Sequence, residues 1–88
     1  MRAVETYLRD HESRFIAELS DYLRFPSISA QPEHRAAMRR CAEWLCQHCR
    51  QIGLTARICR TPGHPVVLAR SFTRRRPGRK HFVVYGHY

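Results

Sequence analysis

The sequence predicts an α/β chain in which two helices precede three strands, and three observations support this fold class. Apolar residues recur with a helical period of about 3.6 before Gly53, and strand-like alternation replaces this period afterwards. Segment 81–85 is apolar on both faces, which is typical of a strand covered on both sides in an α/β sheet. With 88 residues, 43% of them hydrophobic, the composition is globular and allows one small domain at most.

The first predicted helix spans residues 4–24 and carries an apolar stripe on one face. The stripe consists of Val4, Leu8, Phe15, Leu19 and Tyr22, with Ile16 and Leu23 beside it. His11 falls on the same stripe, where we expect a packed or partly exposed side chain rather than a ligand. Pro26 ends the helix, because it cannot continue one and it disfavours the helical conformation for Phe25.

The second predicted helix begins near Pro32 and runs to about Ile52. Pro32 suits the first helical position, and Glu33 is favourably placed against the positive end of the helix dipole. Gly53 suits the left-handed cap that follows a helix. The expected buried stripe consists of Met38, Cys41, Ala42, Leu45, Cys49 and Ile52.

Four cysteines raise the question of a zinc knuckle or a redox pair, because Cys46 and Cys49 form a CxxC motif around His48. A second CxxC that would complete a tetrahedral site is missing, and Cys59 stands alone. Helical spacing places Cys41 and Cys49 on the buried stripe, so structural thiols are the favoured interpretation over zinc or redox chemistry.

The second half of the chain predicts three strands. Residues 55–60 and 66–70 have strand-like patterns and are separated by a turn at 61–65 that contains two prolines and a glycine. A basic loop from Arg74 to Lys80 then leads to the third predicted strand, at 81–85.

Charge is divided unevenly between the two halves. Residues 1–53 contain 8 Arg and all 7 carboxylates, whereas residues 54–88 contain 7 Arg, one Lys and no acid. The second half therefore excludes a carboxylate pair for acid–base catalysis and an oxygen-rich site for a hard cation. Metal chemistry there has to use His or Cys, or carboxylates from elsewhere.

His87 is the candidate metal ligand. It follows the third predicted strand, and ligands in α/β sheets bind just beyond the carboxyl ends of strands. Gly86 before it permits a close turn, and an imidazole suits a borderline-soft cation such as zinc.

Three segments together resemble a known family. They are Phe25-Pro26-Ser27-Ile28-Ser29, Thr61-Pro62-Gly63-His64-Pro65-Val66-Val67 and Val83-Val84-Tyr85-Gly86-His87-Tyr88. With the helix that contains Ala42-Glu43-Trp44-Leu45, they resemble the N-terminal part of the dinuclear zinc aminoacylase, acetylornithine deacetylase and dipeptidase superfamily. The Tyr-Gly-His-Tyr motif is most similar to the dipeptidase branch. The resemblance implies that residues 1–88 are the opening part of a zinc-exopeptidase-type mixed-sheet domain, truncated before most active-site residues.

The resemblance also implies a chemistry. His87 matches the family histidine that binds one of two Zn²⁺ ions, and the other ligands and the catalytic Glu lie downstream in the family. The parent enzyme would hydrolyse amide bonds of dipeptides or N-acyl amino acids with a zinc-bridged water. The present chain contains none of the catalytic carboxylates, so we expect a fragment that is inactive alone. The family's dimer contacts lie mostly in a lid domain, so a homodimer would form through that absent part.

Two other interpretations remain open. Five of the seven residues from Arg74 to Lys80 are basic, which is the pattern of a small nucleic-acid-binding module, although no aromatic side chain is interleaved for base stacking. The two helices are also consistent with a docking face for a partner protein. No apolar run approaches a membrane span, and Glu5 and Asp10 interrupt the N-terminus, so we expect a cytoplasmic protein without membrane contact.

Overall fold

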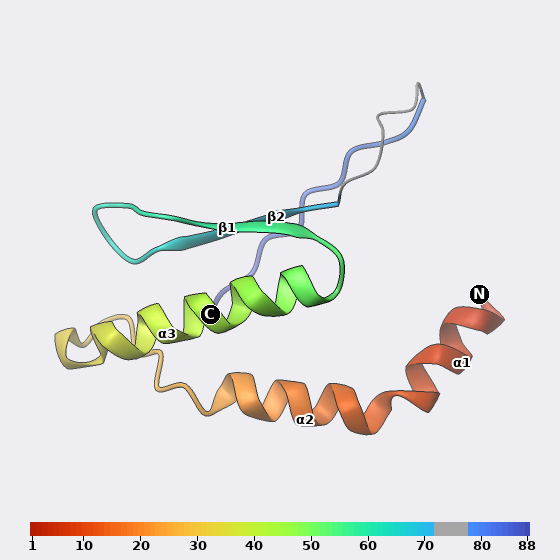
Figure 1. Cartoon of the computed structure of the whole chain (residues 1–88), viewed down its shortest axis with the longest axis horizontal. Helices are drawn as coiled ribbons and strands as arrows, with labels where there is room; N and C mark the ends of the chain where they lie inside the picture. The colour runs from red at the N-terminus through yellow and green to blue at the C-terminus, as the bar shows by residue number, and fades with distance from the viewer. Residues whose placement is uncertain (72–77) are drawn as a thin grey trace.

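The computed structural model describes residues 1–71 and 78–88, and it confirms a small α/β chain. Its elements are α1 (Arg2–Asp10), α2 (Glu12–Leu23), the 3₁₀ turn η1 (Pro32–His34), α3 (Arg35–Gln51), β1 (Thr55–Cys59) and β2 (Val66–Arg70). In Figure 1, α3 lies between the β-hairpin and α2, and α1 extends away from the other elements.

The first predicted helix forms as two helices that meet at His11. The backbone there leaves the helical region, with φ −111° and ψ 12°. Two hydrogen bonds still bridge the junction, from the His11 N–H to the Tyr7 carbonyl (3.1 Å) and from the Phe15 N–H to the His11 carbonyl (3.0 Å). The junction is therefore a bend bridged by backbone hydrogen bonds. Much of that stripe is more than half exposed: Val4, Leu8, Ile16, Leu19 and Leu23.

The ends of α3 form as the sequence predicts. Pro32 starts the 3₁₀ turn that leads into the helix. At the other end, the Gly53 N–H donates to the Arg50 carbonyl (3.1 Å) and the Leu54 N–H donates to the Cys49 carbonyl (3.0 Å). These two bonds are a Schellman motif, and Gly53 takes the left-handed conformation that the motif requires, with φ 95°.

The two strands form an antiparallel hairpin in which Thr55 pairs with Arg70 and Cys59 with Val66. Thr61 organises the turn between them. Its hydroxyl donates to the His64 carbonyl (2.7 Å) and accepts from the Gly63 N–H (3.1 Å). The prediction of two strands joined by a turn is confirmed, with the first strand ending at Cys59 rather than at Arg60.

The core lies between α3 and the hairpin. Among the described residues, the buried hydrophobic side chains come from α3: Ala37, Met38, Cys41, Ala42 and Cys46. The predicted stripe is thus correct at Met38, Cys41 and Ala42, whereas Cys46 is buried more deeply than Cys49, and Ile52 is exposed. The Arg50 guanidinium fastens the end of α3 to the hairpin, because its Nε (3.1 Å) and Nη2 (2.9 Å) both donate to the Ala56 carbonyl.

Trp44 joins α2 to α3. Its ring centroid lies 5.7 Å from that of Tyr22 and 6.3 Å from that of Phe25. On its own helix, His48 stacks on Trp44 at 5.0 Å with the planes nearly parallel, and the His48 Nε2 lies 3.8 Å from a Glu18 carboxylate oxygen. Aromatic contacts therefore dominate this helix–helix joint.

The third predicted strand does not form in the described part of the chain. Residues 81–85 run as irregular chain, and the sheet that the structure describes contains β1 and β2. The segment is exposed, up to 95% at Val84, because neither strand edge lies in pairing position beside it. In the described ranges, no helix combines the length and the apolar content needed to cross a bilayer.

Candidate functional site

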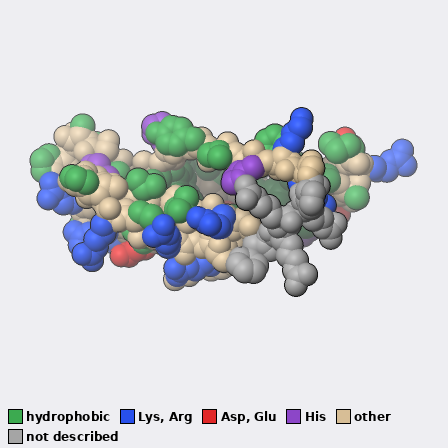
Figure 2. All heavy atoms as spheres, turned by 90° about the horizontal axis from the view of Figure 1, so that it is seen from above, with side chains coloured by type: hydrophobic (Ala, Val, Ile, Leu, Met, Phe, Trp, Pro, Cys, Tyr) green, Lys and Arg blue, Asp and Glu red, His purple; other side chains and the backbone are tan. Residues whose placement is uncertain are grey.

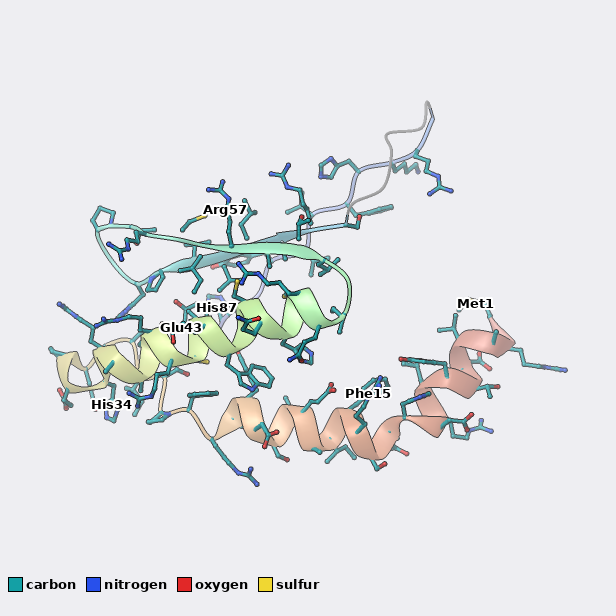
Figure 3. The ribbon with its side chains drawn as sticks, viewed as in Figure 1. Met1, Phe15, His34, Glu43, Arg57 and His87 are labelled. Atoms are coloured by element: carbon teal, nitrogen blue, oxygen red, sulfur yellow. The ribbon has the colours of Figure 1, made fainter. Side chains whose placement is uncertain are left out.

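The candidate ligand His87 lies in the irregular segment 86–88, which we call the terminal segment. In the view of Figure 3, His87 is seen in projection against α3. The Tyr22 hydroxyl of α2 donates to the His87 carbonyl at 2.7 Å, across 65 residues of sequence. The His87 ring meets the Tyr85 ring edge-on, with centroids 5.1 Å apart. The backbone of His87 is therefore anchored, while its imidazole remains exposed.

Tyr88 anchors the other side of the terminal segment. Its hydroxyl donates to the Pro65 carbonyl in the turn of the hairpin. Burial raises the pKa of Tyr88, and the nearby Cys41 and Tyr22 raise that pKa further when they are ionised. Burial likewise raises the pKa of Tyr22. Both hydroxyls are therefore kept protonated, which is the form that donates these hydrogen bonds.

The hairpin turn that receives Tyr88 is itself tied to the loop after α2. The His64 Nε2 donates to the Ser29 carbonyl at 2.9 Å. Together with the Thr61 bonds, this contact holds the Pro65 carbonyl in place. The end of α2 and the hairpin turn therefore both hold the terminal segment.

Gly86 has no steric role in the described structure. A Cβ added at this residue would meet no atom within 4 Å, and its φ is not positive. The close turn that the sequence suggested for Gly86 is therefore not required by the contacts of the described residues.

Among the described residues around this position, the His87 imidazole is the one ligand suited to zinc. Within the described ranges, no group of three or more His, Cys, Asp or Glu side chains gathers where it could hold a metal ion. A catalytic zinc ion in a protein needs about three protein ligands. The exposed imidazole of His87 can supply one of them, and the neighbouring Tyr22 and Tyr88 supply hydroxyls that already donate to backbone carbonyls.

The CxxC cysteines are poorly placed for metal or redox chemistry. Cys46 is buried and Cys49 is partly buried in α3, and all four cysteines are free thiols. Burial raises the pKa of Cys49 and of Cys41, which disfavours the thiolate that both chemistries require. Within the motif, His48 is engaged in the stack on Trp44.

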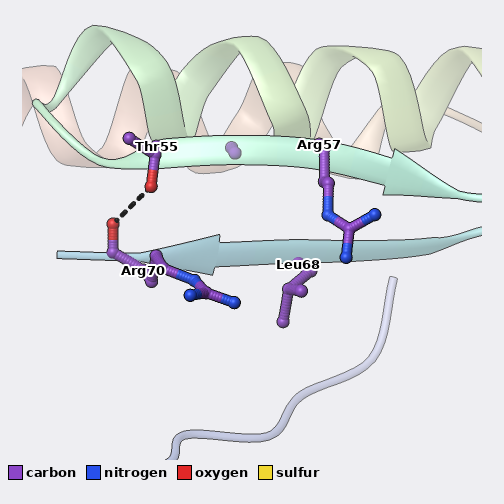
Figure 4. A pocket seen from close by; sticks show the side chains of 5 residues that line it. Thr55, Arg57, Leu68 and Arg70 are labelled. Carbon is purple, nitrogen blue, oxygen red and sulfur yellow. Dashed lines mark hydrogen bonds between the residues drawn. The ribbon is translucent and has the colours of Figure 1, made fainter. Parts of the chain in front are cut away.

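A second candidate site is a shallow hollow of about 140 Å³ on the outer face of the hairpin. Figure 4 shows its lining, with Arg57 and Arg70 flanking Leu68 and with a hydrogen bond from Thr55 to the Arg70 carbonyl. In the view of Figure 2, Lys and Arg side chains are widespread and carboxylates are sparse, as the acid-free second half of the sequence predicts. Most of the basic loop, residues 74–77, lies outside the described residues.

Comparisons with known proteins found no matching family model, no matching curated protein and no matching solved structure.

The sequence predicted His87 as a ligand, which stays a prediction, and it did not point to the two tyrosines whose hydroxyls hold this part of the chain. Tyr22 falls on the apolar stripe of the first helix, where it is indistinguishable from a core residue. Tyr88 is adjacent to His87, but its partner is a backbone carbonyl of the hairpin turn, which carries no side-chain signal. Such long-range contacts with backbone atoms leave no periodic pattern in a sequence.

Proposed function

We propose that the chain is the N-terminal part of a zinc-dependent hydrolase that cleaves amide bonds in dipeptides or N-acyl amino acids. The observation that carries this proposal is the Tyr-Gly-His-Tyr motif, which follows an apolar segment and resembles the motif of the dipeptidase branch. In this proposal His87 is a ligand of one Zn²⁺ ion, and the remaining ligands come from residues that follow the motif in the family.

The surroundings of His87 support a ligand role. The backbone of His87 is anchored to α2 and its imidazole is exposed, so a ring nitrogen is accessible to a metal ion. A bound zinc ion supplies Lewis-acid polarisation of a carbonyl and lowers the pKa of a water molecule. In this proposal the described residues supply His87 as the ligand and Tyr22 as the group that holds its backbone. Residues 54–88 contain no Asp or Glu and so contribute no catalytic carboxylate.

Reassembly of a split enzyme tests this proposal. Residues 1–88 are co-expressed with the remainder of a family dipeptidase, beginning at the Asp that follows the motif, and dipeptide hydrolysis is measured with and without Zn²⁺. We expect Zn²⁺-dependent activity that falls at least about 100-fold with His87→Ala, because a zinc ligand is lost. His81→Ala is the matched control, since His81 is exposed in the same irregular segment and should retain activity.

Two outcomes would contradict the proposal. One is full activity of the His87→Ala variant. The other is no activity with residues 1–88 under conditions in which the dipeptidase's own N-terminal segment restores it.

Nucleic-acid binding is the alternative function, and the outer hairpin face with Arg57 and Arg70 is the described feature that favours it. A basic surface binds phosphates through counterion release, so its affinity for random duplex DNA falls steeply with salt. Micromolar binding at about 50 mM salt that disappears at higher salt would support this alternative. Absence of binding at that salt concentration rejects it.

A further inference from the structure

We propose that the 88-residue chain forms a dimer in which residues 81–85 of two copies pair as antiparallel strands. We call residues 81–85 the pairing segment. Its four apolar side chains are between 80% and 95% exposed: Phe82, Val83, Val84 and Tyr85. This inference goes beyond the proposed function and does not depend on zinc.

The backbone of the pairing segment is available for strand hydrogen bonds. No hydrogen bond joins this backbone to another described residue, and the described sheet consists of β1 and β2. Two anchors hold the chain just after the segment, from the Tyr22 hydroxyl to the His87 carbonyl and from the Tyr88 hydroxyl to the Pro65 carbonyl. Valine, phenylalanine and tyrosine favour strands, and an unpaired run of such residues is a template for another strand.

The pairing segment is complementary to itself about Val83. In an antiparallel pair with two-fold symmetry, one residue faces its own copy, and the residues on either side of it face each other. With Val83 at the axis, Phe82 of one copy faces Val84 of the other. His81 likewise faces Tyr85, so a ring meets a ring at each end. Cross-strand pairs of aromatic and β-branched residues stabilise antiparallel sheets.

The neighbouring symmetric register is less favourable. With Val84 at the axis, Phe82 would face Gly86, which has no side chain to pack against it. The register about Val83 therefore gives every apolar residue of the pairing segment a partner side chain.

Charge favours the antiparallel arrangement over a parallel one. Each copy carries a net charge of +9, so two copies repel each other, but the pairing segment contains no Lys, Arg, Asp or Glu. Parallel pairing in register would place Lys80 opposite Lys80, which is destabilising. Antiparallel pairing about Val83 separates the two Lys80 residues by six residue steps, about 20 Å at about 3.4 Å per residue. This separation exceeds the Debye length of about 8 Å at physiological salt.

The first test measures the dissociation constant of the dimer by sedimentation velocity. We expect the dimer to tighten roughly 10-fold between about 0.05 and about 0.5 M NaCl, because salt screens the repulsion between the two copies. Binding to nucleic acid would show the opposite salt dependence. Val83→Lys places two charges opposite each other at the axis and should weaken the dimer at least about 10-fold. Leu23→Lys is the matched control, since it adds the same charge at a residue of α2 that is 68% exposed.

The second test reads the register by disulfide formation with glutathione disulfide as the oxidant. The variants Val83→Cys and Val84→Cys are compared in a background in which Cys49 and Cys59 are replaced by serine. Directly opposed residues have Cα atoms about 4.5–5.5 Å apart, which a disulfide can bridge. The two Val84 residues are diagonal neighbours about 7–8 Å apart, beyond that reach. We expect covalent dimer from Val83→Cys to form at least about 10-fold faster than from Val84→Cys.

Three outcomes overturn the proposal. One is a monomer at every concentration up to about 1 mM at both salt concentrations. The second is a dimer that Leu23→Lys weakens and Val83→Lys does not, which would place the contact on the helices. The third is equal cross-linking of the two cysteine variants, which contradicts antiparallel pairing about Val83. Circular dichroism checks that each variant retains its helices, as expected because the substituted valines are exposed.

Discussion

Replacing Trp44 with alanine should uncouple α2 from α3 while leaving the hairpin on α3. Trp44 is the centre of the joint, because both Tyr22 and Phe25 direct their rings at it. Apart from these rings, the joint contains the His48–Glu18 contact at 3.8 Å, between partly exposed side chains. Such an ion pair contributes little free energy.

The expected loss can be worked out from these contacts. Two aromatic pairs contribute about 0.5–1.5 kcal/mol each beyond the burial of area, which gives roughly 1–3 kcal/mol. Core Trp→Ala substitutions cost about 3–5 kcal/mol, and Trp44 is only partly buried, so we expect about 3 kcal/mol. A chain of 88 residues typically has a total free energy of unfolding of roughly 4–13 kcal/mol. The substitution therefore removes a large share of the stability.

Thermal melts followed by far-UV circular dichroism at matched concentration measure this loss. A loss of 3 kcal/mol corresponds to a fall in Tm of roughly 12–24 °C for a chain of this size. Trp44→Phe retains a ring and should lose about 1 kcal/mol. Tyr7→Ala is the control, because the described ring partners of Tyr7 are His11 and Phe15, and neither lies in α3. A Trp44→Ala melt within about 4 °C of wild type would refute the reasoning.

Three further predictions concern α3 and its connections. Arg50→Met removes two hydrogen bonds to the Ala56 carbonyl and should lower the free energy of unfolding by about 1–2 kcal/mol in urea titrations, whereas an unchanged midpoint contradicts the fastening role. Gly53→Ala forces a Cβ into φ 95° and should cost about 1–2 kcal/mol in the same assay, and a neutral result would show that the helix end relaxes. Burial raises the pKa of the Cys41 thiol above its value in the unfolded chain. The contribution of this thiol to folding stability is therefore complete below the unfolded pKa and is lost as pH rises through the folded pKa. Iodoacetamide at pH 8 should accordingly modify Cys41 more slowly than the partly exposed Cys59, as mass spectrometry of timed digests would show, and equal rates contradict this.

The sequence predicted most of the local structure, because local structure has local signals. The helix end at Gly53 and the turn after Cys59 were predictable from backbone preferences of single residues. The bend at His11 was not, since no proline or glycine marks it and the apolar stripe runs through it unchanged. A stripe reports which residues share a face and carries no information about a bend between two segments of that face.

The burial of side chains and the pairing of strands were harder to predict, because both depend on which other element each face contacts. The stripe of the first predicted helix has the pattern of a core face, but among its described residues Tyr22 is the one whose ring contacts Trp44, and Phe25 joins it from beyond the helix. Segment 81–85 has the composition of a covered strand, yet β-pairing requires a neighbouring edge within hydrogen-bonding distance. The resemblance to zinc hydrolases stays a prediction that rests on residues, and reassembly of the split enzyme is its test.

Tyr22 makes one contact with Trp44 and another with His87, and this connection gives a final prediction. The Tyr22 ring packs on Trp44 and its hydroxyl holds His87, so truncation of Trp44 should loosen a residue with which it has no described hydrogen bond or ring contact. We expect the order parameter of the His87 backbone amide to fall to about 0.6 or lower in Trp44→Ala and to stay near 0.85 in Trp44→Phe. A rigid His87 in Trp44→Ala would show that the hairpin alone, through Tyr88 and Pro65, holds the terminal segment. In that case α2 would be dispensable for presenting the proposed zinc ligand.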